Sequence, residues 1–142
     1  MTRRSWTLLA LSSASGAPMS PVQLQKALFL IGRNLSSEQR GGGVFYTFQA
    51  YDYGPFDSGV YADADLLQQQ GFVRIVDGSP RTYSITDLGM MEAKRLRTGL
   101  QPEVVDYLDR VGSWVRSLSF SELVRAIYVQ YPEMKANSVF SG

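Results

Sequence analysis

Hydrophobic residues recur at helical spacing over most of the chain and alternate with polar residues in only a few short runs. The spacing predicts a first helix over 5–15, which ends at Gly16. A second helix follows, and the residues Ser20-Pro21-Val22-Gln23 form its start signal, with serine as N-cap and glutamine completing a capping box. The second helix has a wide apolar stripe, so we expect Lys26 and Arg33 on its remaining solvent-facing side.

The middle of the chain predicts a strand, a tight turn and a third helix. The run 44–48 is rich in aromatic and β-branched residues, which is the composition of a β-strand. Gly54-Pro55 indicates a sharp turn between strand and helix, because proline fixes φ and glycine permits a reversal. Asp57 is a candidate N-cap for a helix over about 58–70, which Gly71 ends.

The second half of the chain combines one β-hairpin with further helices. Alternating residues at 72–76 and 82–85, joined by turn-forming residues, predict the hairpin. Start and stop signals then predict a helix over 86–97, a longer helix that begins at Pro102, and a last helix over about 120–131. The expected fold is therefore mainly α with a small β-hairpin, in the α+β class.

The order of these elements is that of a winged helix, in which three helices precede a two-stranded wing. The passage LLQQQGFVRIVDGSPRTYSITDLG resembles the helix–glycine–hairpin segment of many winged-helix regulators. We expect a single domain over 1–142, with a winged-helix-like part at 1–99 and a C-terminal helical extension at 100–142. The C-terminal helices also offer a surface for a homodimer.

Composition removes most catalytic and metal chemistry from consideration. The 142 residues include no cysteine and no histidine, and the net charge is +1. Disulfides, thiolate nucleophiles, cysteine-ligated metals and histidine-based triads are therefore excluded. We expect no catalytic residue, no metal and no cofactor, and hence a protein that is not an enzyme.

The N-terminal segment imitates an export signal, because Arg3-Arg4 precedes an apolar stretch. That stretch covers only 6–11, which is shorter than the hydrophobic region of such a signal. No other run approaches the ~18–20 apolar residues of a membrane span. We therefore expect a first helix with an apolar face, in a cytoplasmic protein.

Three short motifs resemble the Panacea family and the related YwgA-like domains. They are Leu24-Gln25-Lys26 in the second predicted helix, Tyr53-Gly54-Pro55-Phe56 at the predicted turn, and Tyr131-Pro132-Glu133 near the end of the chain. The resemblance covers most of the sequence. It implies an antitoxin-like partner domain that binds and neutralises a toxin encoded beside it, or a domain tied to proteolytic adaptor systems.

One candidate surface would bind DNA. The third helix of a winged helix enters the major groove, but the segment 57–70 carries three aspartates and no lysine or arginine, which suits a polyanion poorly. A DNA-binding transcription regulator would instead use basic residues on the hairpin and the next helix, which are Arg74, Arg81, Lys94, Arg95 and Arg97. Alternatively, these residues form a solvated face that balances nearby acids.

The other candidate surface is an acidic, aromatic patch around the predicted turn. Its residues are Tyr51, Tyr53, Phe56, Tyr61, Asp63 and Asp65. Aromatic residues are favoured at the centres of protein interfaces, and an acidic patch would attract a basic partner. The sequence thus favours a non-enzymatic, protein-binding regulator of the antitoxin type acting on a basic toxin-like protein, with a winged-helix DNA-binding regulator as the alternative.

Overall fold

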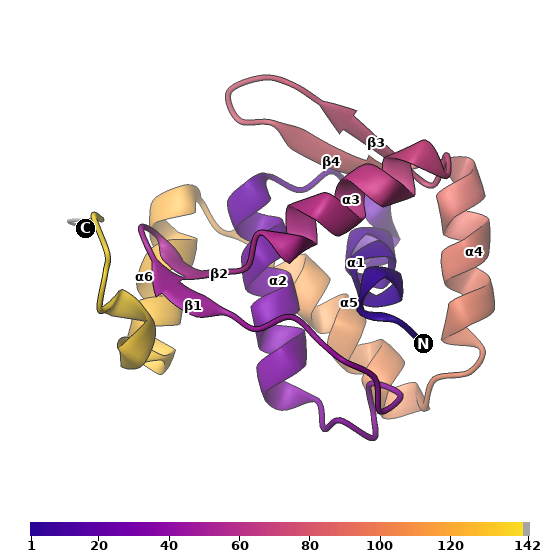
Figure 1. The fold of residues 1–142 in the computed structure, drawn as a ribbon, viewed down its shortest axis with the longest axis horizontal. Helices are drawn as coiled ribbons and strands as arrows, with labels where there is room; N and C mark the ends of the chain where they lie inside the picture. The colour runs from indigo at the N-terminus through magenta and orange to yellow at the C-terminus, as the bar shows by residue number, and fades with distance from the viewer. Residues whose placement is uncertain (141–142) are drawn as a thin grey trace.

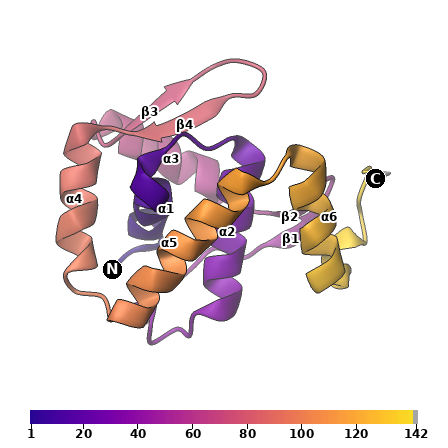
Figure 2. The same cartoon turned by 180° about the vertical axis from the view of Figure 1, so that it is seen from behind.

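Helix α2 (Pro21–Asn34) forms the centre of the fold in a computed structural model of the chain, which describes residues 1–140. α1 (Arg3–Ser12) packs against one side of α2, α5 (Pro102–Ser117) crosses behind it, and α6 (Phe120–Gln130) lies on the far side (Figures 1 and 2). Every residue of α2 from Leu24 to Ile31 is buried. The helix is therefore packed around its whole circumference.

Two further helices, α3 (Gly59–Gln69) and α4 (Asp87–Arg97), pack against α1. Every residue from Trp6 to Ser13 is buried. Short 3₁₀ turns follow α1 at Ala14–Gly16 (η1) and α6 at Pro132–Lys135 (η2). The chain is mainly helical with two small two-stranded antiparallel sheets, so the predicted helical character is confirmed.

The predicted hairpin is present and has an additional partner. Its strands β3 (Val73–Val76) and β4 (Thr82–Ile85) pair antiparallel and project from the body of the fold (Figure 1). Met19, just before α2, forms an isolated antiparallel bridge with Tyr83 of β4. The backbone N–H of Met19 donates to the Tyr83 carbonyl at 2.9 Å, and the Tyr83 N–H donates to the Met19 carbonyl at 2.8 Å.

Most helices begin where the sequence signals place them. Ser20 Oγ accepts from the Gln23 backbone N–H at 3.3 Å, and Gln23 Oε1 accepts from the Ser20 N–H at 2.8 Å, which completes the capping box of α2. Thr86 caps α4 by accepting from the Gly89 N–H at 3.0 Å. Proline at position 102 opens α5, as predicted.

The first helix ends earlier than predicted. α1 stops at Ser12 rather than continuing to Ser15, and η1 follows it. Ala14 and Ser15 have φ values of 48° and 69°, in the left-handed region that an α-helix does not use.

Two predictions for the middle of the chain are wrong. Residues 44–48 form no strand, because their aromatic rings pack into or against the core and the chain there has no regular structure. A second hairpin follows instead, made of β1 (Gln49–Tyr51) and β2 (Gly54–Phe56). Gly54-Pro55 therefore begins a strand, and the chain reverses just before it.

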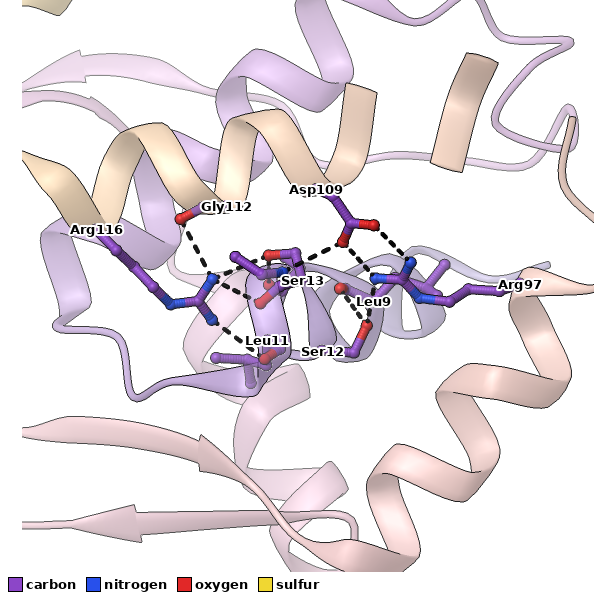
Figure 3. A network of polar contacts seen from close by, with 10 residues as sticks. Leu9, Leu11, Ser12, Ser13, Arg97, Asp109, Gly112 and Arg116 are labelled. Carbon is purple, nitrogen blue, oxygen red and sulfur yellow. Dashed lines mark hydrogen bonds and ion pairs between the residues drawn. The ribbon is translucent and has the colours of Figure 1, made fainter. Parts of the chain in front are cut away.

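The buried end of α1 has carbonyl oxygens that need donors, since water cannot reach them. Arg116 of α5 supplies these donors (Figure 3). Its guanidinium donates to the carbonyls of Leu11 at 3.2 Å and Ser13 at 2.7 Å. It also donates to the Ala17 carbonyl at 2.9 Å. One side chain thus joins the end of α1 and the segment before α2 to α5.

An ion pair ties α4 to the same place. Arg97 contacts both carboxylate oxygens of Asp109 on α5, at 2.9 and 3.1 Å, and donates to Ser12 Oγ at 3.2 Å (Figure 3). The Asp109 carboxylate also accepts from the Ala14 N–H at 3.2 Å. The hydrogen bond from Arg97 is the main cause that lowers the pKa of Asp109.

We predict that Gly112→Ala destabilises the protein although alanine is the better helix former. A Cβ at Gly112 would overlap the Ser13 side chain where α5 crosses the end of α1. Such overpacking costs about 1–3 kcal/mol, which outweighs the ~1 kcal/mol that alanine gains in an open helix. Urea denaturation measures the difference, with Ser113→Ala on the exposed face as control. A Gly112→Ala protein as stable as the wild type would contradict this packing.

Candidate protein-binding groove

An open groove of about 790 Å³ lies between α2, the β1–β2 hairpin and the start of α6. The two strands of the hairpin run between these helices in Figure 1. Most of the lining surface is apolar. Its main contributors are Val22, Gln25 and Lys26 from α2, Tyr51, Asp52, Tyr53, Gly54 and Phe56 from the hairpin, Tyr61 from α3, and Phe120 and Leu123 from α6.

Aromatic rings hold the hairpin wall in place. Tyr51 stacks on Phe56 with 5.0 Å between ring centroids, and Phe56 meets Tyr61 edge-on at 5.7 Å. Tyr53 meets Phe120 of α6 edge-on at 5.1 Å. Tyr51 and Tyr53 remain about half exposed, at 53% and 45%. Four of the six residues expected to bind a partner therefore line one groove.

A pair of hydrogen bonds fixes the start of α3 against α2. The Gln25 side chain donates to the Asp57 carbonyl at 3.0 Å and accepts from the Asp57 N–H at 3.1 Å. The Asp57 carboxylate accepts from the N–H groups of Gly59 at 2.7 Å and Thr47 at 2.8 Å. Asp57 thus binds the first N–H of α3, as its predicted capping role requires, although Ser58 occupies the cap position.

Lys26 contradicts its sequence-based placement on a solvent-facing side of α2. Its side chain is only 3% exposed, and this burial lowers the pKa of its ammonium to about 7. Arg33, the other expected surface residue, is exposed and pairs with Glu133 at 3.1 Å. The two cations differ because the β1–β2 hairpin and α6 cover α2 at Lys26.

Gly54 allows the close approach that buries Lys26. Its φ is 103°, a value that favours glycine, and a Cβ there would lie 3.3 Å from the Tyr128 ring. The same Cβ would lie 3.6 Å from Lys26 Cε and 3.7 Å from Lys26 Nζ. Gly54 therefore forms part of the groove wall, and Gly54-Pro55 begins strand β2 rather than forming the turn.

Asp63, one of the six residues expected to contact a partner, is buried and bound to other residues of the protein. Its carboxylate accepts from the Tyr46 hydroxyl at 2.7 Å and pairs with Arg3 Nε at 3.1 Å. The Tyr46 hydroxyl also bonds to Thr7 Oγ1 at 2.6 Å, and burial raises the pKa of Tyr46 above its usual range. Asp65, two residues further along α3, is exposed.

The basic residues considered for DNA binding are mostly engaged within the protein. Arg97 is held by the ion pair at the end of α1, and its side chain is only 19% exposed. Arg81 and Arg95 are exposed and pair with acids on their own hairpin and helix. Arg74 and Lys94 are exposed and form no ion pair among residues 1–140. The structure does not gather these five side chains into one basic cluster.

Comparison with known proteins returned no matching family model, no matching curated protein and no matching solved structure. Within the described residues, no helix is both long and apolar enough to cross a membrane. The same residues contain no group of three or more acidic side chains placed to hold a metal ion.

Sequence reasoning missed the groove residues outside the aromatic patch. The sequence pattern places Lys26 on a solvent-facing side of its helix, and it gives Gln25 and Phe120 no part in a binding surface. One signal for Lys26 was available, because apolar residues flank it on nearly every side of the helix. A helix of that composition is buried all round.

We predict that Asp63→Ala destabilises the protein by about 1–3 kcal/mol, because it leaves the buried Tyr46 hydroxyl without its acceptor. Asp65→Ala is the matched control on the same helix, and an exposed substitution of this kind changes stability by about 0.5 kcal/mol or less. Thermal and urea unfolding of both variants measure the difference. Equal stability of the two variants would show that Asp63 is not buried as described.

We also predict that Lys26→Met stabilises the protein in a pH-dependent way. The unfolded chain keeps the lysine proton up to about pH 10.5, whereas the folded chain releases it near pH 7. The cost of the buried ammonium is therefore fully present below pH 7 and is lost as pH rises toward 10.5. Each tenfold change in proton affinity is worth about 1.4 kcal/mol, so the stability that Lys26→Met gains is at most about 5 kcal/mol.

Urea unfolding at about pH 6 and about pH 10 tests this prediction, with the exposed Lys94→Met as control. Other groups titrate equally in both proteins, so the difference between wild type and variant isolates Lys26. A Lys26→Met stability gain that is the same at both pH values would contradict the prediction.

Proposed function

We propose that the protein is a non-enzymatic, protein-binding regulator of the antitoxin type, which neutralises or escorts a partner through the aromatic groove. The observation that carries this proposal is the groove itself, in which Tyr51 and Tyr53 present half-exposed rings beside Phe120 of α6. Rigid aromatic side chains around an apolar hollow are the usual anchor points of protein interfaces. Single apolar residues scattered over a surface are common and indicate no function, whereas a groove lined by contiguous apolar side chains marks an interaction site.

The residues that carry the resemblance to the Panacea family support the same surface. Gln25 and Lys26 of the first motif line the groove, as do Tyr53, Gly54 and Phe56 of the second. The third motif lies at the other end of α2, where Glu133 pairs with Arg33 and the Tyr131 ring meets Phe29 at 4.9 Å. The three motifs are thus the parts that hold the hairpin and the C-terminal helices around α2.

The charge around the groove supports a partner that is basic overall. Asp52 lies on the lining and Asp65 on the nearby helix α3, and both are exposed. Exposed acids steer a basic protein toward its docking surface and raise the association rate. With Asp63 neutralised by Arg3, this attraction is weaker than the sequence alone suggests.

A winged-helix-like core is part of the proposal, and the Met19–Tyr83 bridge supports it because a third short strand beside the wing is expected in that arrangement. The same observation favours the alternative of a DNA-binding regulator. Of the five basic residues considered for DNA binding, only Arg74 and Lys94 are exposed without an ion pair among residues 1–140, and two cations provide little phosphate neutralisation.

We predict that Tyr53→Ala weakens partner binding about tenfold or more, because it removes an aromatic anchor from the groove. The partner to test is the protein encoded beside this chain in the source genome, in a co-expression growth assay for neutralisation and by calorimetry. Met91→Ala is the matched control, since Met91 is 68% exposed on α4, away from the groove. Unchanged neutralisation by Tyr53→Ala, or tight salt-dependent binding of duplex DNA in its place, would contradict the proposal.

A further inference from the structure

Lys26 is the one buried charged side chain of the groove, and its ammonium has no partner among the described residues. No carboxylate oxygen of residues 1–140 lies within 4.0 Å of its nitrogen, and it makes no side-chain hydrogen bond there. Every fully inaccessible side-chain nitrogen and oxygen in this region does have a hydrogen-bond partner. The Lys26 ammonium therefore keeps contact with the exterior, and the groove that Lys26 lines provides it.

The surroundings of this ammonium define what could bind it. Lys26 is only 3% exposed, and the end of its side chain lies against the backbone of the β1–β2 hairpin at Gly54. It is the only cation among the groove residues, and Asp52 is the only anion. The rest of the lining is uncharged and mostly apolar, and it includes the paired rings of Tyr53 and Phe120.

We propose that the Lys26 ammonium binds a carboxylate that the partner protein presents beside an apolar side chain in one docking segment. This inference rests on the proposed protein-binding function and names the chemistry of its anchor. A buried ammonium without a counter-ion is costly, and a carboxylate removes that cost through a charge-assisted hydrogen bond in a water-poor site. An apolar side chain of the same segment fills the aromatic part of the groove.

A single negative charge fits this site better than a phosphate does. Phosphate sites usually combine several donors, from arginine forks or from backbone N–H groups at a helix start. The groove offers one ammonium, and Asp52 on its lining would repel a doubly charged group. Nucleic acid, with its repeated phosphates, is disfavoured for the same reason.

Binding a carboxylate should couple to proton uptake. The free ammonium loses its proton near pH 7, so a ligand that requires the charged form binds more weakly as pH rises above that value. The other titratable groups on the groove lining are Tyr51, Asp52 and Tyr53 from the hairpin and Tyr61 from α3, and Tyr128 of α6 lies beside Gly54. Carboxyl and tyrosine groups ordinarily titrate outside the range of about pH 6–8.5, so Lys26 dominates there.

The test uses 3-phenylpropionate as probe and the neutral 3-phenylpropanamide as its matched control, followed by amide-resolved NMR titration. In the wild type at about pH 6 we expect the carboxylate to bind about tenfold more tightly than the amide, with shifts at Gly54 and the start of α6. At about pH 8.5 the preference should shrink, and in Lys26→Met it should vanish. Lys94→Met should keep the wild-type preference.

Three results would overturn the proposal. They are equal binding of carboxylate and amide, a carboxylate preference that survives in Lys26→Met, and the same groove shifts caused by inorganic phosphate alone. The thermal unfolding of Lys26→Met serves as the folding control. Failure of the Lys26 proposal can be told apart from failure of the proposed function. If Tyr53→Ala loses the partner protein and Lys26→Met binds it normally, only the role of Lys26 is refuted.

Discussion

Complete enclosure of helix α2 is the constraint on which the rest of the structure depends. Because the helix is covered on every side, each polar side chain on it must find a partner in whatever packs against it. Gln25 does so by pairing with the backbone of Asp57, which fixes where α3 begins. Gln23 does so at the N-terminus, where it bonds to Ser20 and to the Val115 carbonyl of α5.

The same rule operates at the buried end of α1 and explains why two arginines are not surface charges. Arg116 satisfies carbonyl oxygens that the helix leaves open, and Arg97 joins α4 to α5 through Asp109. Lys26 is the exception to the rule. The residue is as buried as its neighbours on α2, yet its ammonium has no partner in the described chain and reaches the exterior only through the groove. This exception is the reason for the proposal that the ammonium binds a ligand.

Much of the fold could be predicted because its signals are local. Ser20 with Gln23, Thr86 and Pro102 mark helix starts through contacts within one turn, and the β3–β4 hairpin follows from alternation on either side of a turn sequence. The β1–β2 hairpin could not be predicted in the same way. Each of its strands has three residues, too few for a periodic pattern, and the aromatic run before it is a core segment.

The candidate site could be predicted only in part, because its decisive contacts join distant parts of the chain. The tyrosines of the patch were recognisable from composition alone. The burial of Lys26 depends on Gly54 and Tyr128, and that of Asp63 depends on Arg3 and Tyr46. No spacing in the sequence shows that these residues meet.

The most direct test of the account is an NMR titration of the three lysine side chains, with the Lys26 signal identified by its absence in Lys26→Met. The account predicts that Lys26 loses its proton near pH 7, as a desolvated ammonium without a counter-ion should. A Lys26 pKa near the ordinary value of 10.5 would contradict it. That result would mean either that burial does not desolvate the amine or that a carboxylate of the chain already pairs with it.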